Sequence, residues 1–367
     1  MLPERLAAYV TYFEHLASQP PNRWEGFALP AHDERIYGLR FQLAFACYAL
    51  GAIARHTEIE FEERMRCHEA MYALIVRMLQ RRVWAYWALP AEHTERGTEP
   101  IDAPNLTYSA HLAMMIGVYK ISGGDTRFDE PFTLHWSSRE RFHYTFTTLV
   151  EALWRALRAS PINAMPSFSG RIDPYTMGHA LWALRMHDTL FATSYSNDTT
   201  RWLKFLAKRM AIGGPALSGR RAFSSTYLTG LRTPVGTSDN LSDAWSLAFL
   251  VALDEPLARR RAKRFLPAIR RLPTTGTGAR AFTPVSGRRA RNEWSDTALA
   301  SGFSYLLALE LGDTALADAL LAYADTEFQP VSDALGRRYT KPKATVFTTA
   351  LFALGEAGGV GRMRNAE

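Results

Sequence analysis

The chain of 367 residues has little of what several protein classes require. It holds two cysteines, Cys47 and Cys67, which are too few for a disulfide framework or a four-thiolate metal site. No apolar run approaches the roughly 18 residues that a membrane span needs. The N-terminal segment carries Glu4, Arg5 and Glu14 where a signal peptide needs an uninterrupted apolar core. We therefore expect a soluble, cytoplasmic protein with no membrane span, and we interpret both cysteines as buried helix thiols.

Sequence motifs that hold phosphates, metals or nucleophiles are also missing. The chain has no GxxxxGK[ST], no GxGxxG after a strand, no HExxH, no CxxC and no GxSxG. Aspartate-rich motifs of the DDxxD or DxDD kind, which hold a diphosphate through metal ions, are absent too. The sequence therefore predicts no cofactor and no metal, and favours acid–base chemistry by side chains on a bound organic molecule.

Positive charge is in excess and clustered. The net charge is +7, and most of the cluster lies at 258–271, with a shorter basic segment at 287–292. Aromatic residues are not interleaved among these arginines as a stacking platform for nucleic acid requires. We interpret the cluster as a solvated outer helix face and predict no nucleic-acid partner. Docking of an acidic carrier protein on 258–271 is the alternative that this pattern leaves open.

What the sequence does contain is a repeat of six nearly all-apolar helical segments. They begin at Leu43, Tyr108, Thr176, Asp243, Ala298 and Val346. Amphipathic segments alternate with them, and we expect helices at 4–17, 61–80, 138–159, 199–210, 257–271 and 314–326. This alternation predicts an all-α (α/α)6 barrel, a toroid of six inner and six outer helices, in one domain over 1–367. Short hairpin pieces are expected at 221–230 and 278–284.

Polar residues gather where the inner helices begin, and in such a barrel these ends open on one face. The residues that we single out there are Tyr108, His111, Asp173, Thr176, His179, Asp239, Asn240, Asp243 and Tyr339. Tyr108 and His111, Thr176 and His179, and Asn240 and Asp243 are i, i+3 pairs, so each pair is expected to share a helix face. The aspartates also stand where helix N-caps are expected, which is a purely structural alternative.

We assign roles to these residues as a hypothesis. His111 would exchange a proton with the substrate, while Asp243 or Asp239 would orient it or stabilise developing positive charge. Tyr108, Asp173 and Thr176 would hydrogen-bond a substrate oxygen. The aromatic side chains of Tyr37 and Trp245 would contribute to an apolar lining, and Tyr339 would also contact the substrate. Ordinary core packing is the alternative for each aromatic residue.

Several strings in the chain resemble the linalool dehydratase/isomerase family. They are RVWAYW from Arg82, TEPIDAPNLTYSAHL from Thr98 and YKISGGDTRFDE from Tyr119. The resemblance continues through ASPINAMP and DPYTMGHALWALRMHDTLFATSYSNDTTRWLKF, and more weakly through DAWSLAF and ALASGFSYLLALELGD to GRRYTKP. It implies an (α/α)6 barrel, homo-oligomeric and cofactor-independent, whose apolar cavity takes a monoterpene alcohol.

The resemblance places the family's histidine on His111 and the tyrosine of the same segment on Tyr108. It places the two active-site cysteines of the family on Ser167 and Thr176, so hydroxyls stand where the family has thiols. The segment that carries the family's aspartate is missing from the shortened region between Gln19 and Leu43. We therefore expect an isomerase, lyase or cyclase of hydrophobic terpenoid, polyene or polyketide-like molecules, and not linalool dehydration.

Two alternatives from other classes remain. A carbohydrate-active barrel would use paired carboxylates, for which Asp239 with Asp243 and Glu293 with Asp296 are candidates. A catalytically inactive binding protein would keep a pocket without a titratable side chain in reach of its ligand.

Overall fold

The structure is a computed structural model of the chain. It describes residues 1–29, 38–88, 98–102, 105–168, 170–211, 222–237, 240–269, 293–340 and 344–364. These residues are mostly helical, with three small antiparallel sheets. Among them, no helix is both long enough and apolar enough to cross a bilayer. The buried apolar side chains form one continuous core.

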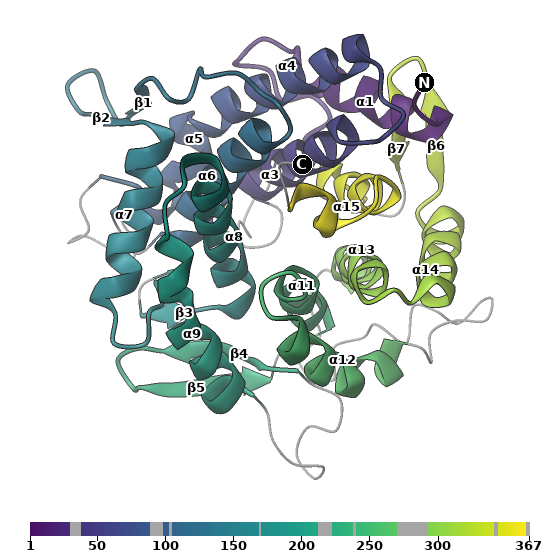
Figure 1. Ribbon diagram of the computed structural model, residues 1–367. Helices are drawn as coiled ribbons and strands as arrows, with labels where there is room; N and C mark the ends of the chain where they lie inside the picture. The colour runs from purple at the N-terminus through teal and green to yellow at the C-terminus, as the bar shows by residue number, and fades with distance from the viewer. Residues whose placement is uncertain are drawn as a thin grey trace.

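Six helices form a closed ring in the middle of the molecule (Figure 1). In chain order they are α3 (Leu39–Ala54), α6 (Leu106–Ile121), α8 (Pro174–Phe191), α11 (Asn240–Leu250), α13 (Glu293–Leu311) and α15 (Val346–Glu356). Each packs against the next, and α15 packs back against α3. The six apolar segments of the sequence are these six helices.

Further helices lie outside the ring (Figure 1). They are α1 (Glu4–Ala17), α4 (Phe61–Met78), α7 (Phe146–Ala159), α12 (Glu255–Ile269) and α14 (Thr314–Glu327). A helical stretch on the same side as α7 and α8 consists of η2 (Tyr195–Thr199), α9 (Thr200–Phe205) and the π-helical turn η3 (Leu206–Met210). Shorter helical turns are α5 (Arg81–Trp84), η1 (Ala85–Ala88) and η5 (Val360–Met363).

The difference between inner and outer helices follows from their sequences. In α3 every side chain is buried, because apolar or small residues cover all sides of the helix. In α7 the buried side chains, from Phe146 to Leu157, lie on one face, and Arg155 and Arg158 are exposed on the other. The helix α7 begins after Thr145, whose hydroxyl accepts from the backbone N–H of Thr148 and so caps the first turn.

Glycines allow the inner helices to approach closely. A Cβ added at Gly51 of α3 would overlap Val118 of α6, and one added at Gly117 of α6 would lie 2.9 Å from Met186 of α8. Neither position tolerates a larger residue unless the neighbouring side chain shifts. The ring is therefore tight along these two contacts.

The small sheets connect the helices at their ends. A hairpin of β1 (Phe132–His135) and β2 (Arg141–Tyr144) precedes α7, and a second of β6 (Pro330–Asp333) and β7 (Gly336–Tyr339) precedes α15. In the third sheet β4 (Ser224–Leu228) pairs with both β3 (Arg171–Ile172) and β5 (Thr233–Thr237).

These strands confirm one expectation and correct another. The hairpin piece expected at 221–230 contains β4, whose hairpin partner β5 lies just beyond this range, whereas the piece expected at 278–284 lies outside the described residues. The helix expected over 138–159 was wrong in its first turns, which form β2 because the RFHY segment alternates and the cap at Thr145 delays the helix.

Candidate functional site

Two histidines meet at the centre of the ring. His111 of α6 and His179 of α8 are completely buried, and their ring centroids are 4.0 Å apart. Every other inner helix adds an aromatic ring to the same cluster. These rings are Phe41, Phe45 and Tyr48 of α3, Trp245 and Phe249 of α11, Phe303 of α13 and Phe347 of α15. The two imidazoles are therefore enclosed in an aromatic, low-dielectric environment.

The protonation of His179 is fixed by its neighbours. Trp245 donates from Nε1 to Nε2 of His179 at 2.8 Å, and an indole N–H can only donate. Nε2 therefore accepts, and the ring proton is on Nδ1, which lies 3.2 Å from Sδ of Met114. Burial and the neighbouring His111 lower the pKa of His179 well below 6.5. We infer that His179 stays neutral and acts as a fixed part of the wall.

His111 is different because one of its ring nitrogens has no partner. Its Nδ1 lies 3.0 Å from the hydroxyl of Tyr48. Its Nε2 is buried and has no hydrogen-bond partner among the described residues. The Tyr48 hydroxyl also lies 3.4 Å from the carbonyl oxygen of His111. Tyr48 can thus donate to the carbonyl while it accepts from Nδ1, which leaves the lone pair on Nε2 without a donor.

Burial and a nearby guanidinium hold His111 in the neutral form. Desolvation in the apolar centre and the positive charge of Arg40 lower the pKa of His111 to about 3. Arg40 is itself buried, and its guanidinium stacks on the rings of Tyr86 and Phe41, with distances of 3.9 and 4.6 Å to the ring centroids. At neutral pH the site therefore contains a neutral imidazole beside a fixed positive charge.

A second group of polar side chains lies where α8 begins. Asp173 precedes the helix, and its carboxylate accepts from the hydroxyl of Thr226 of β4 at 2.5 Å. Its backbone N–H donates to the hydroxyl of Ser167 at 3.2 Å. Burial raises the pKa of Asp173. Asp173 occupies the expected N-cap position, but its side chain makes no capping hydrogen bond, so it does not serve the helix end.

Thr176 lies between these two groups on α8. It comes one turn after Asp173 and one turn before His179, so it lies on the side of the helix that carries both. Its hydroxyl is buried and has no hydrogen-bond partner in the described part of the chain. Thr176 and His111 thus each present an unsatisfied polar atom inside an otherwise apolar interior. Such atoms are uncommon in folded proteins, and a catalytic role is one of the explanations for them.

The structure does not bring every predicted residue to this centre. Tyr108 points to the outer layer, where its hydroxyl donates to the carbonyl of Met78 at 3.1 Å. Asp243 accepts from the backbone N–H groups of Ala222 and Phe223 at 2.9 and 3.1 Å, which fixes the segment that leads into β4. Tyr339 donates to Asp325 of α14 at 2.7 Å.

Some predicted residues cannot be placed. Tyr37 and Asp239 lie outside the described residues, and nothing is described of the side chains of Glu293 and Asp296. The pairing of His111 with Tyr108 through a shared helix face is replaced by the pairing with Tyr48. Two features were missed from the sequence, the Tyr48 hydroxyl and the Trp245 bond to His179. The bonded residues are 63 and 66 positions apart in the sequence, so neither contact can be predicted from local residue spacing.

The side chains of the described residues include no group that is typical of a metal site. Among the described residues, no three His, Cys, Asp or Glu side chains are grouped so that they could hold an ion. Cys47 and Cys67 are buried and unpaired by disulfide, as expected, and burial raises the pKa of both thiols. Neither thiol is therefore poised as a nucleophile.

A comparison with protein families gives one finding. The family model of linalool dehydratase/isomerase matches residues 40–345 of the chain. The matched range covers five of the six ring helices, from α3 to α13, and ends just before α15. It contains His111, Ser167, Asp173 and Thr176.

Proposed function

The chain belongs to the linalool dehydratase/isomerase family, and from that premise we propose that it is an isomerase or lyase that moves a proton on a hydrophobic small molecule at His111. The ring of six helices and its outer helices would be the (α/α)6 barrel expected from the sequence, with the reaction near its axis. The aromatic enclosure suits a terpenoid or a related apolar metabolite.

The observation that carries this proposal is the open Nε2 atom of His111. It is the one nitrogen of the two central imidazoles that lacks a partner in the described residues, and the His111 side chain is completely buried. A neutral imidazole with a free lone pair can accept a proton from a bound substrate, and negative charge that forms on the substrate oxygen would raise the pKa of His111 above its low value in the empty site. Tyr48 supports this role because its hydroxyl holds Nδ1 and so fixes the orientation of the ring.

The positive charge of Arg40 favours one kind of reaction over another. A cation near His111 disfavours a carbocation in the same space and favours a substrate oxygen that gains negative charge. We propose that Nε2 takes a proton from a carbon next to a carbonyl group and returns it to another carbon of the same conjugated system. The Thr176 hydroxyl would donate to the carbonyl oxygen while that oxygen carries the charge.

The replacement of thiols supports a reaction other than linalool dehydration. By the resemblance, Ser167 and Thr176 stand where the family has cysteines, and hydroxyls are poor acids and bases near neutral pH. In this structure the Ser167 hydroxyl accepts the backbone N–H of Asp173 and so serves the start of α8. We infer that the proton chemistry has moved to His111, with Asp173 and Thr176 binding the substrate.

The test uses hydrogen exchange as the readout, because it reports proton transfer even without net conversion. The purified protein is incubated in D2O with linalool, geraniol and a hydrophobic conjugated enone, and deuterium in the recovered molecules is measured by gas chromatography with mass spectrometry. We expect exchange or isomerisation of the enone. His111→Asn should reduce it by roughly 10²-fold or more, since positioned acid–base groups contribute that much. Tyr48→Phe should reduce it by a smaller factor.

A matched control removes a phenol from the same helix as His111. Tyr119→Phe deletes a hydroxyl that bonds Asp125 near the far end of α6, and the activity should not change. Full activity in His111→Asn would contradict the proposal. Dehydration of linalool that survives in His111→Asn would show that the chemistry lies elsewhere in the fold.

A further inference from the structure

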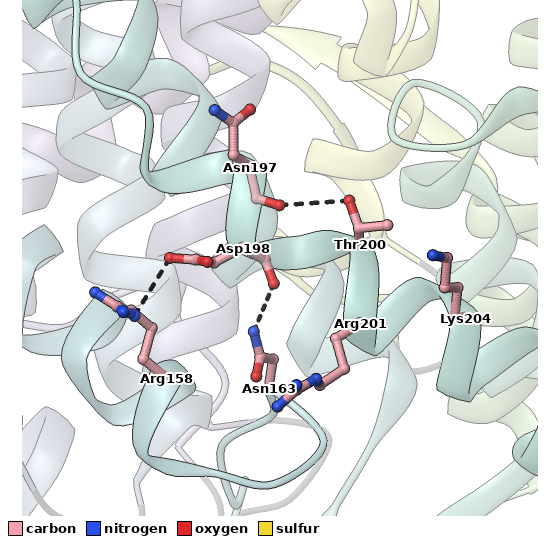
Figure 2. Close-up of a pocket in the computed structure, with 7 residues that line it drawn as sticks. All are labelled: Arg158, Asn163, Asn197, Asp198, Thr200, Arg201 and Lys204. Carbon is pink, nitrogen blue, oxygen red and sulfur yellow. Dashed lines mark hydrogen bonds and ion pairs between the residues drawn. The ribbon is translucent and has the colours of Figure 1, made fainter.

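A polar hollow lies on the outer wall, away from the histidines. It has a volume of about 500 Å³ and opens where the end of α7 meets η2 and α9 (Figure 2). Three of the side chains that line it are cations: Arg158 of α7, and Arg201 and Lys204 of α9. The amides of Asn163 and Asn197 also line it. This volume is within the range of small-ligand sites, about 300–1,000 Å³.

The negative charge in the hollow belongs to Asp198, which already contacts protein side chains. Asp198 is the only carboxylate among its described lining residues. Its Oδ2 accepts from Nε1 of Trp154 at 2.8 Å and lies 3.6 Å from Nε of Arg158. Its backbone carbonyl accepts from the amide of Asn163 at 2.7 Å, as Figure 2 shows. Asp198 therefore offsets Arg158 and leaves two positive charges unbalanced.

Among the described residues, no acid forms an ion pair with Arg201 or Lys204, and both side chains are exposed. The nearby acids have other donors. Glu151 accepts from the Tyr195 hydroxyl, and Asp188 accepts from Thr193 and from two backbone N–H groups of η2. Among the residues that line the hollow, positive charge therefore exceeds negative charge.

The local structure keeps both cations on one side of the helix. Arg201 and Lys204 are three residues apart, which places them on the same face, where like charges repel. The π-helical turn that follows is tied to α12, because Arg261 donates to the carbonyl of Ala207 at 2.9 Å. In Figure 2 the Arg201 side chain extends toward Asn163 across the hollow. A ligand there would meet cations from two separate elements.

We propose that this hollow binds a phosphorylated small molecule, a phosphate ester or a diphosphate. A phosphate group offers several acceptor oxygens in different directions, which suits a guanidinium, an ammonium and amide donors placed around one space. The volume exceeds what a single phosphate fills, so the organic part of the ligand has room beside it. The site is separate from His111 and does not depend on the function proposed above.

The test is isothermal titration calorimetry of the full chain with pyrophosphate at low ionic strength, with chloride held constant. We expect saturable binding of one pyrophosphate per chain. Arg201→Gln and Lys204→Gln should each weaken it about tenfold, the effect of losing one hydrogen bond to a charged group. Asp198→Asn should tighten it several-fold, because the amide oxygen can still accept from Trp154 while the negative charge is gone.

The control is Lys208→Gln, which removes the same charge from an exposed lysine four residues after Lys204 that does not line the hollow. The affinity of the Lys208→Gln variant for pyrophosphate should equal that of the wild type. If Lys208→Gln and Lys204→Gln weaken binding equally, the attraction is diffuse and the site is refuted. The absence of saturable binding by the correctly folded protein, or capture of anionic lipid vesicles that pyrophosphate does not displace, would also overturn the proposal.

Discussion

Replacing His111 by asparagine should change how stability depends on pH. Asparagine keeps a polar atom near the position of Nδ1, so the contact with Tyr48 can persist, and it removes the titrating ring. The folded chain binds a proton at His111 only near pH 3, whereas the unfolded chain binds it below about 6.5. Between about pH 3 and pH 6.5 the wild type therefore takes up a proton when it unfolds, and its free energy of unfolding falls as the pH falls.

The size of the effect follows from the width of the window. Between pH 7.5 and pH 4.5 the wild type loses about 2–3 kcal/mol through His111, at about 1.4 kcal/mol for each pH unit below 6.5. His111→Asn loses none of this. At pH 7.5 the variant should be less stable by roughly 1–3 kcal/mol, because a smaller side chain leaves the aromatic cluster underpacked. At pH 4.5 the two proteins should be nearly equal, or the variant the more stable.

Urea unfolding followed by circular dichroism at several pH values measures this difference. Phe347→Leu is the control, since it also reduces packing in the same cluster, against Phe45, without removing a titrating group. Its free-energy difference from the wild type should be the same at pH 7.5 and at pH 4.5. If the difference in free energy of unfolding between His111→Asn and the wild type did not change with pH, the reasoning would be refuted, because His111 would then titrate alike in the folded and unfolded chains.

Two further predictions concern Trp245 and Asp173. Trp245→Phe keeps most of the ring but leaves Nε2 of His179 without its donor, so we expect a loss of about 1–2 kcal/mol in the free energy of unfolding at neutral pH, measured by urea unfolding. Asp173→Asn should leave the melting temperature at pH 7.5 unchanged or raise it, because a carboxylate whose pKa is raised on folding opposes folding above that pKa. Any reaction at the site should slow. A fall in the melting temperature of several degrees would contradict this expectation.

The positions of the ring helices could be predicted from the sequence, but the contacts between these helices could not. The apolar segments from Leu43 and Val346 were recognisable because residues buried on all sides leave no polar face. The hairpins β1–β2 and β6–β7 were missed because each strand has only four residues, over which an alternation such as that of RFHY is too short to identify a strand. His111 was found from its apolar helix and from a family resemblance. Its partner Tyr48 was not, because that contact exists only once the ring closes.

The strand β4 fixes two of the ring helices at once. Its Thr226 bonds Asp173 at the start of α8, and the two residues before it, Ala222 and Phe223, bond Asp243 in the first turn of α11. The helices that carry His179 and Trp245 therefore share one support outside the ring. Substitutions in this strand would move both helices together and preserve the bond between the two rings. Selection could thus reshape the enclosure for new substrates by mutating a peripheral strand, while the residues at its centre stay the same.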